Sequence, residues 1–372
     1  MGNPEILVVG GGVIGCAIAR ELAGAGCKVV LLEKDRVAAE ASSAAAGILC
    51  SQLEAEVPSP LVGLGIESLR GYASFVEALS AETGIDPELD RGGILMLDMT
   101  REDAAASDRL LSWQGPAGLP VEKLTSRQIA GLEQGLGTSL MSGLLFPKGG
   151  RVEPGTLTRA LAAAARARGV RIREGCPIAS LMRDKDRITG VLLEDGERIA
   201  ADRVILAAGA WSARLLPEVK VGVFPVRGQI LLLDARRPPR RHSLVTPRVY
   251  LAYRRDGTVL VGSTLEKVGF RKAVTPKAML KLLASALVLD PSLEEAELAG
   301  SWSGLRPGTS DELPLIGPVM EGLWLATGHY RNGILLAPLT AAVTAEWVVR
   351  GTINRLLEPF SPLRTPIPAA HA

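Results

Sequence analysis

The stretch ILVVGGGVIG, residues 6–15, joins a continuous apolar run to a G-x-G-x-x-G motif. Four consecutive apolar residues are typical of a buried parallel strand, so we expect a strand over residues 6–9. A helical pattern follows the motif as far as Ala25, and Gly26 provides a stop signal. The order of strand, glycine turn and helix predicts the first unit of a Rossmann-like α/β domain.

The motif glycines predict a phosphate site. Gly10 permits the tight turn, Gly12 lets the backbone approach a pyrophosphate, and Gly15 lets the helix lie close to the strand. The helix start at Val13 and Ile14 offers N–H groups and partial positive charge to the phosphates. A glycine-rich turn without a ligand is the alternative interpretation.

A second apolar run, residues 28–32, ends at Glu33, eighteen residues beyond Gly15. A carboxylate at this point accepts hydrogen bonds from ribose hydroxyls and repels a 2′-phosphate, which argues against NADP. The sequence thus predicts a dinucleotide site that includes Glu33 and the adjoining Lys34.

Two later stretches favour FAD over NAD. Residues 40–49 are small, polar at one end and apolar at the other, as suits a chain lying against a phosphate–ribityl group and a flat ring; Ser42 or Ser43 could equally cap a helix. Residues 202–211 form a predicted buried strand that ends in small residues, after a turn at 194–196. Because no second G-x-G-x-x-G is present, electrons are expected to come from a small substrate and leave to dioxygen or another acceptor.

Composition excludes several classes of protein. The chain has 42 Lys and Arg against 40 Asp and Glu, so no nucleic-acid or anionic-membrane partner is expected. The densest basic run, residues 236–242, is predicted to be a solvated loop. The four cysteines form no C-x-x-C pair, which predicts no metal site and favours a reduced, cytoplasmic protein. The apolar run 334–349 is interrupted by Pro338 and Glu346, so no membrane-spanning segment is predicted.

The rest of the chain predicts a second αβ step and a further sheet. Residues 157–168 are helical in pattern and 170–172 strand-like, while 221–233 and 247–264 are rich in strand formers, with a hairpin turn at 256–257. Near the end, GHYRNGILLAPLT, residues 328–340, predicts a helix that starts at Gly333.

With these stretches in view, the sequence resembles the D-amino-acid oxidase superfamily of flavoproteins, and within it the glycine oxidases of thiamine biosynthesis. The resemblance covers nearly the whole chain, and its specific motifs are SGLRPGTSDELPLIG, residues 303–317, and GHYRNGILLAP. It implies non-covalent FAD, since residues 306–317 contain no cysteine for a covalent link. It also implies an α/β (α+β) fold with an FAD-binding domain (1–87, 145–217 and 304–372) interleaved with a substrate-binding domain on a mostly antiparallel sheet (88–144 and 218–303).

The resemblance also implies a site. Arg306 and Tyr250 are expected to hold a substrate carboxylate, and Arg331 to add positive charge; the alternative for Arg306 is an ion pair with Asp311 or Glu312. The helix start at Gly333 would stabilise negative charge on the flavin. The expected cofactor-binding residues are Gly10, Gly12, Val13, Ile14, Gly15, Glu33, Lys34, Ser42, Ser43, Ala46, Gly47, Ile48, Ile178, Ala208, Gly209, Trp211, His329, Arg331, Asn332, Gly333, Ile334 and Leu335.

These features predict FAD-dependent oxidative deamination of glycine or another small amino acid or amine, with dioxygen as acceptor and a homo-oligomeric assembly. Two other hypotheses stay open: a D-amino-acid or proline-type dehydrogenase that passes electrons to a quinone, and a redox-silent flavin-binding protein. A silent binder has no need of a carboxylate clamp, which argues against the latter.

Overall fold

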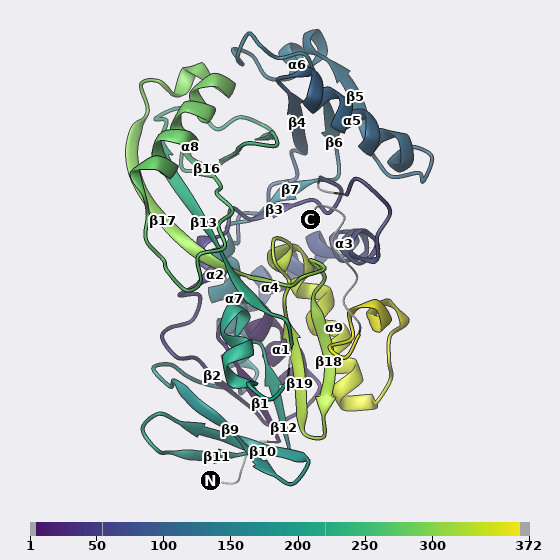
Figure 1. The fold of residues 1–372 in the computed structure, drawn as a ribbon, viewed down its shortest axis with the longest axis vertical. Helices are drawn as coiled ribbons and strands as arrows, with labels where there is room; N and C mark the ends of the chain where they lie inside the picture. Colours follow the sequence, from purple (N-terminus) through teal and green to yellow (C-terminus); the bar gives the residue numbers. More distant parts are fainter. Residues whose placement is uncertain (1–4, 54, 220, 365–372) are drawn as a thin grey trace.

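The first strand, β1 (Ile6–Val9), lies inside a six-stranded sheet in the lower half of the computed structural model (Figure 1). The strand order is β18-β19-β12-β1-β2-β8, with β18 antiparallel to β19 and the other neighbours parallel. The remaining strands are β2 (Val29–Leu32), β8 (Arg171–Arg173), β12 (Arg203–Leu206), β18 (Leu315–Met320) and β19 (Leu323–Thr327). The predicted Rossmann-like sheet is therefore confirmed. The structure describes residues 5–53, 55–219 and 221–364.

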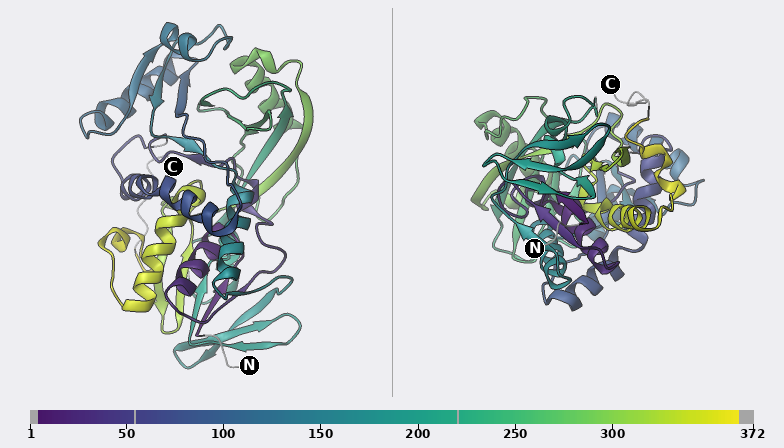
Figure 2. Two further views of the ribbon diagram at one scale, coloured as in Figure 1. Left: turned by 180° about the vertical axis from the view of Figure 1, so that it is seen from behind. Right: turned by 90° about the horizontal axis from the view of Figure 1, so that it is seen from below.

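Three helices, α1 (Val13–Gly24), α7 (Pro154–Ala167) and α9 (Gly333–Arg350), lie side by side against this sheet (Figure 2). A buried apolar cluster, which includes Leu22 and Leu161, joins them to β1. Each such leucine contributes roughly 1.5–3 kcal/mol through burial. The predicted helix and stop are confirmed, because α1 ends at Gly24 and Gly26 has a left-handed φ of +88°.

Helix α9 continues through both Pro338 and Glu346, which interrupt its apolar run but not the helix. Pro338 lacks the N–H that would bond to the carbonyl four residues back, at Ile334. The Tyr72 hydroxyl donates to that Ile334 oxygen instead, at 3.0 Å, and Ser68 donates to the next carbonyl at 2.6 Å. α9 is long and apolar enough to cross a membrane, but 56% of it is buried inside the protein.

The upper half of the molecule is built on an eight-stranded sheet in the order β17-β13-β16-β15-β14-β4-β6-β5 (Figure 1). Its strands are β4 (Ile94–Asp98), β5 (Glu122–Thr125), β6 (Ser142–Phe146), β13 (Phe224–Asp234), β14 (Ser243–Val245), β15 (Tyr250–Tyr253), β16 (Thr258–Gly262) and β17 (Glu297–Gly308). All neighbours are antiparallel except β14 with β4. The mostly antiparallel sheet and the hairpin turn at residues 256–257 are confirmed.

Two strands of the upper sheet cross the predicted domain boundaries. β6 spans the boundary placed at 144/145, and β17 spans that at 303/304. β17 pairs with β13 along almost its whole length, and both strands run from the upper sheet down toward the lower one (Figure 1). The two sheets are therefore linked by long, continuous strands. The predicted domain ranges also include residues 1–4 and 365–372, which lie outside the described residues.

Shorter elements complete the structure. A meander of β9 (Ile178–Asp184), β10 (Arg187–Leu193) and β11 (Arg198–Ala200) contains the predicted turn at 194–196. The other elements are α2 (Ala41–Ala44), β3 (Ile48–Leu49), α3 (Pro60–Arg70), α4 (Tyr72–Thr83), α5 (Arg101–Gln114), α6 (Ser126–Leu132), β7 (Gly150–Arg151), η1 (Gly209–Leu215), α8 (Pro276–Leu289), η2 (Pro291–Leu293) and η3 (Arg355–Phe360).

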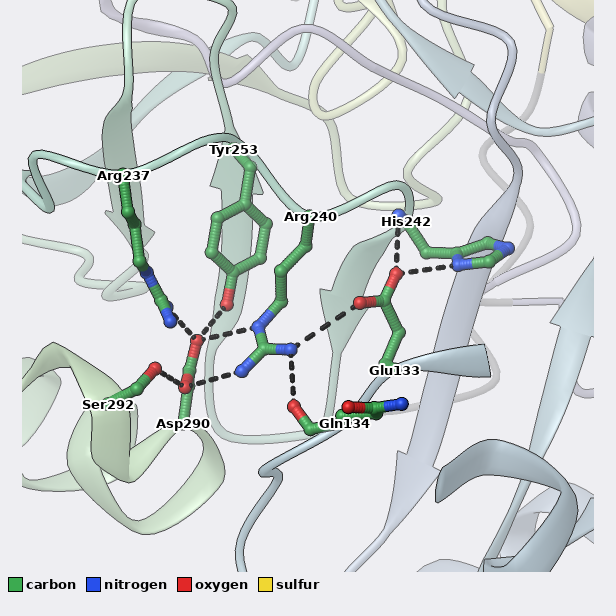
Figure 3. Close-up of polar contacts among 8 residues, drawn as sticks. All are labelled: Glu133, Gln134, Arg237, Arg240, His242, Tyr253, Asp290 and Ser292. Carbon is green, nitrogen blue, oxygen red and sulfur yellow. Dashed lines mark hydrogen bonds and ion pairs between the residues drawn. The ribbon is translucent and has the colours of Figure 1, made fainter. Parts of the chain in front are cut away.

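The basic run at 236–242 is an irregular loop, as its composition predicts, but three of its side chains, Arg237, Arg240 and His242, turn inward. Asp290, fully buried at the end of α8, accepts hydrogen bonds from Arg240 at 2.8 Å and from Arg237 at 2.7 Å (Figure 3). His242 Nδ1 lies 2.8 Å from Glu133, which also pairs with Arg240. The run therefore joins α8 to the segment after α6 by buried ion pairs.

Burial alone would raise the pKa of Asp290, but hydrogen bonds from Arg240, Ser292 and Tyr253 outweigh it and hold that pKa well below its ordinary range. We expect Arg240→Met to lower the free energy of unfolding by about 3 kcal/mol at pH 7, because it leaves a buried carboxylate short of partners. Because the folded pKa is depressed, the stability it gives is present above the ordinary pKa of 3.8 and is lost as pH falls.

Urea unfolding at pH 7 and at pH 3 measures both effects, and the deficit of Arg240→Met should shrink at pH 3. Arg236→Met is the matched control, since Arg236 and its partner Glu297 are both exposed and such pairs contribute at most about 1 kcal/mol. Equal losses in the two variants would contradict the assignment of a buried network.

Candidate active site

A cavity of about 430 Å³ opens along the carboxyl ends of β1, β2, β12 and β19 and extends to β13 and β17. This is the crevice in which open α/β sheets bind ligands. Of the predicted residues, those that line it are Gly10, Gly12, Val13, Ile14, Glu33, Lys34, Ser42, Ile178, Ala208, Gly209, Trp211, Arg306, His329, Arg331, Gly333 and Ile334.

The turn between β1 and α1 forms one wall of the cavity. Gly10 has a φ of +113°, and a Cβ there would lie 2.4 Å from the Ala207 oxygen. A Cβ at Gly15 would lie 1.9 Å from the Gly10 oxygen, so Gly15 provides the close packing of helix on turn. α1 has no acidic residue in its first turn and no side-chain cap at Gly12. The start of α1 therefore presents a positive potential to the cavity.

Neither Ser42 nor Ser43 is the N-cap of the helix in which it lies. Both lie within α2, whose N-cap is Glu40. The Ser42 hydroxyl accepts a hydrogen bond from Val13 N at 2.9 Å, so it meets the start of α1 instead. Ser43 donates to the Ala38 oxygen and lies off the cavity wall, because the backbone turn at Ala38 offers that acceptor.

At the far end of β2, Glu33 is buried and faces the cavity. Its carboxylate accepts hydrogen bonds from Gly11 N at 2.6 Å and Asp35 N at 3.0 Å. These fix its orientation, and a carboxylate has further lone pairs with which to accept from ribose hydroxyls. Beside it, Lys34 Nζ lies 3.5 Å from the centre of the Trp211 ring, which closes this end of the cavity.

The structure places some predicted residues behind the cavity wall. These are Gly15, Ser43, Ala46, Gly47, Ile48, Tyr250, Asn332 and Leu335. Gly47 packs against the backbone of Val152, since a Cβ at Gly47 would lie 2.0 Å from the Val152 oxygen. Leu335 is buried in the core beside α1. Their contribution to cofactor binding stays a prediction.

Arg306 lines the other end of the cavity and Tyr250 lies behind it, and glycines make room for both side chains. A Cβ at Gly228 would lie 2.1 Å from Arg306 Nη1, and a Cβ at Gly262 would lie 2.2 Å from the Tyr250 hydroxyl. Burial raises the pKa of Tyr250, and the charges of Arg306 and Arg331 oppose that rise. The three predicted catalytic side chains therefore act on one another electrostatically.

Of the two alternative ion-pair partners of Arg306, Asp311 and Glu312, Asp311 is bound by Arg364 Nε at 2.8 Å. Arg306 donates instead to Ser263 Oγ at 2.6 Å and to the Thr264 oxygen at 3.3 Å. Sequence reasoning did not assign a role to Ser263 or to Gly228. The stretches PVRGQ, residues 225–229, and LVGSTLE, residues 260–266, also carry the family resemblance, and this was the only signal for these two residues.

The predicted helix start at Gly333 is confirmed, with Asn332 as N-cap and no side-chain cap. Tyr330 N donates to the Pro307 oxygen at 3.1 Å, which ties this loop to the neighbour of Arg306. His329 is buried, and burial lowers its pKa to about 3, so it is neutral at pH 7. Positive charge at this end of the cavity therefore comes from Arg331, Arg306 and the start of α9.

These walls fit a flavin dinucleotide. One end of the cavity has the start of α1 and the carboxylate of Glu33, which can accept from a ribose. The other end has the start of α9 and the side chains of Arg306 and Arg331. Among the described residues, no group of three or more His, Cys, Asp or Glu is placed to hold a metal ion.

A model of the family described as FAD dependent oxidoreductase matches residues 5–347. The chain belongs to this family.

Other members resemble this FAD-dependent oxidoreductase along most of its length. A glycine oxidase from Geobacillus kaustophilus is 36% identical over 363 residues, which cover 96% of each chain. The crystal structure of glycine oxidase from Geobacillus kaustophilus superposes with a TM-score of 0.94 at 35% identity and covers 98% of this chain and 100% of that one. A bifunctional ThiO/ThiG protein of Synechocystis is also 36% identical, and this chain spans 54% of its length.

The family resolves the choice between FAD and NAD in favour of FAD. It also confirms the resemblance inferred from the motifs and the expected fold class. Non-covalent attachment stays a prediction, and it rests on the absence of cysteine from residues 306–317.

Proposed function

We propose that this FAD-dependent oxidoreductase is an amino acid oxidase that deaminates glycine and similar small amines. The observation that carries the proposal is the place of Arg306 at the end of the cavity that lies across from the phosphate-directed turn, with Tyr250 behind it within reach of its charge. The similarity to glycine oxidases at 36% identity over 96% of both chains supports the same substrate class.

The site would bind the substrate by its carboxylate. A guanidinium presents a planar fork that matches a carboxylate, and such charge-assisted bonds are about twice as strong as neutral ones. Tyr250 adds a neutral donor beside it. With the carboxylate held, the amine and the Cα–H take a fixed direction into the cavity, which is the main contribution a protein makes to cofactor chemistry.

Bound FAD supplies the two-electron acceptor for the Cα hydride. Glycine then loses two electrons and two protons to give an imine, which water hydrolyses to glyoxylate and ammonia, and dioxygen takes up the electrons and protons as hydrogen peroxide. The chain's own part is to hold the substrate and to exclude water. Neutral His329 and the cationic Arg331 leave this end of the cavity positive, which favours an electron-rich cofactor.

The test is to add glycine to the enzyme without air and follow the flavin absorbance. We expect bleaching by glycine, and recovery within seconds in aerated buffer with one hydrogen peroxide formed per glycine. Sarcosine, D-alanine and D-proline form the comparison panel. Recovery over minutes in air, with rapid recovery by an artificial quinone, would assign a dehydrogenase instead. If no compound of the panel bleaches the flavin, the assignment as an amino acid oxidase is wrong.

A further inference from the structure

The hydroxyl of Ser263 lies between the two groups that we assign to the substrate carboxylate. Arg306 Nη2 donates to Ser263 Oγ at 2.6 Å, and the Tyr250 hydroxyl lies beside the preceding Gly262, where a Cβ would come within 2.2 Å of it. Ser263 is therefore a shared contact behind Arg306 and Tyr250. Any role for this serine rests on the proposed function, because Ser263 belongs to the same carboxylate site.

The direction of these hydrogen bonds follows from the donor inventory. A guanidinium can only donate, so the Ser263 oxygen accepts from Arg306. The serine has one proton of its own, which it can donate to the Tyr250 oxygen. The phenol proton is then directed away from Ser263. Hydrogen bonds in such a chain polarise one another and strengthen the terminal donor.

We propose that Ser263 is a positioning residue that directs the Arg306 and Tyr250 donors together at the substrate carboxylate. Burial raises the pKa of Tyr250, and the charge of Arg306 and hydrogen bonding by Ser263 lower it. A donor to the phenol oxygen stabilises the charged form and so lowers the pKa, which agrees with Ser263 as the donor.

Ser263 is itself fixed from behind by a network that reaches β13. Thr264 Oγ1 accepts from Gln229 N at 3.0 Å and donates to Glu266 at 2.6 Å. Glu266 also accepts from Gln229 Nε2 at 2.6 Å and pairs with the buried Arg227. Burial alone would raise the pKa of Glu266, but the hydrogen bond from Arg227 and those from Thr264 and Gln229 bring it down to about 2. The carboxylate is thus charged throughout the working pH range and holds the segment in place.

The experiment compares Ser263→Ala with Ser263→Thr, which keeps the hydroxyl. The probe is acetate, a carboxylate without an amine, titrated against the holoenzyme while the absorbance of the bound flavin is followed. Only flavin-loaded molecules contribute to this signal, so the Kd can be measured even for a partly loaded variant. We expect Ser263→Ala to weaken acetate binding about tenfold, consistent with one hydrogen bond to a charged group. Ser263→Thr should stay within about threefold of wild type.

The kinetic constants for glycine should distinguish Ser263→Ala from Ser263→Thr in the same way. Ser263→Ala should raise KM for glycine more than it lowers kcat, and it should leave glycinamide, which lacks the carboxylate, close to wild type. Ser303→Ala is the matched control, because Ser303 lies on β17 with Arg306 but donates to the Lys272 oxygen. An unchanged acetate Kd in Ser263→Ala, or an equal loss in Ser263→Thr, would overturn the inference. If the wild type itself neither binds acetate nor oxidises glycine, the proposed function fails first.

Discussion

Replacing Arg306 with leucine is expected to lower kcat/KM for glycine by about 30-fold to several thousand-fold. Leucine retains apolar bulk but cannot bind a carboxylate, and removal of one partner of a buried, hydrogen-bonded charge pair costs roughly 2–5 kcal/mol. Steady-state kinetics gives the ratio, and the ratio of flavin to protein absorbance checks cofactor content. That content should hardly change, because Arg306 lies at the substrate end of the cavity.

Arg306→Lys sharpens this test. Lysine keeps the charge but loses the planar fork, so we expect it to recover only part of the rate. Full activity in the leucine variant would show that the carboxylate is bound elsewhere. Full activity in the lysine variant alone would show that Arg306 contributes its positive charge and that its planar fork is not required.

Replacing Gly15 with alanine is expected to yield a protein that lacks FAD and melts at a lower temperature. The new Cβ would lie 1.9 Å from the Gly10 oxygen, so α1 or the turn before it has to move. Overpacking of this kind typically costs about 1–3 kcal/mol. The stabilisation that a bound ligand gives is lost in addition. Flavin absorbance after purification and thermal melting with and without added FAD measure the two effects.

Gly63→Ala is the matched control for Gly15→Ala. Gly63 is also inside a helix, α3, but a Cβ there meets no atom within 4 Å. Alanine at an open helical position is favourable by roughly 0.5–1 kcal/mol, so this variant should keep its FAD and melt at the same or a higher temperature. A yellow, stable Gly15→Ala protein would show that close packing at the turn is not required.

The parts of the fold that sequence predicts are those encoded locally. The β1–α1–β2 unit, the turns at 194–196 and 256–257 and the start of α9 each follow from periodicity and glycine placement within a short window. The family motifs then predicted that Arg306, Tyr250 and Arg331 belong to one site, although their spacing in the sequence alone gives no reason to expect it.

What sequence did not predict depends on distant partners. Arg240 looked like part of a solvated basic run, and its burial depends on Asp290, fifty residues away. Ser42 and Ser43 are adjacent and chemically identical, yet one reaches the start of α1 and the other bonds to the Ala38 oxygen. Ser263 lies in a stretch that carries the family resemblance, but its role arises only where β16 ends beside β13 and within reach of Arg306 on β17.

The order of the strands in the lower sheet also constrains how the protein is made. β19 and α9, residues 323–350, are synthesised well after β12 and α1, yet β19 pairs with β12 and α9 packs on α1. Until they emerge from the ribosome, β12 is an uncovered sheet edge and the cavity has no second helix start. Such edges are prone to aggregate. FAD can therefore meet its complete site only after α9 has been made, and the edge of β12 stays uncovered while residues 207–322 are synthesised.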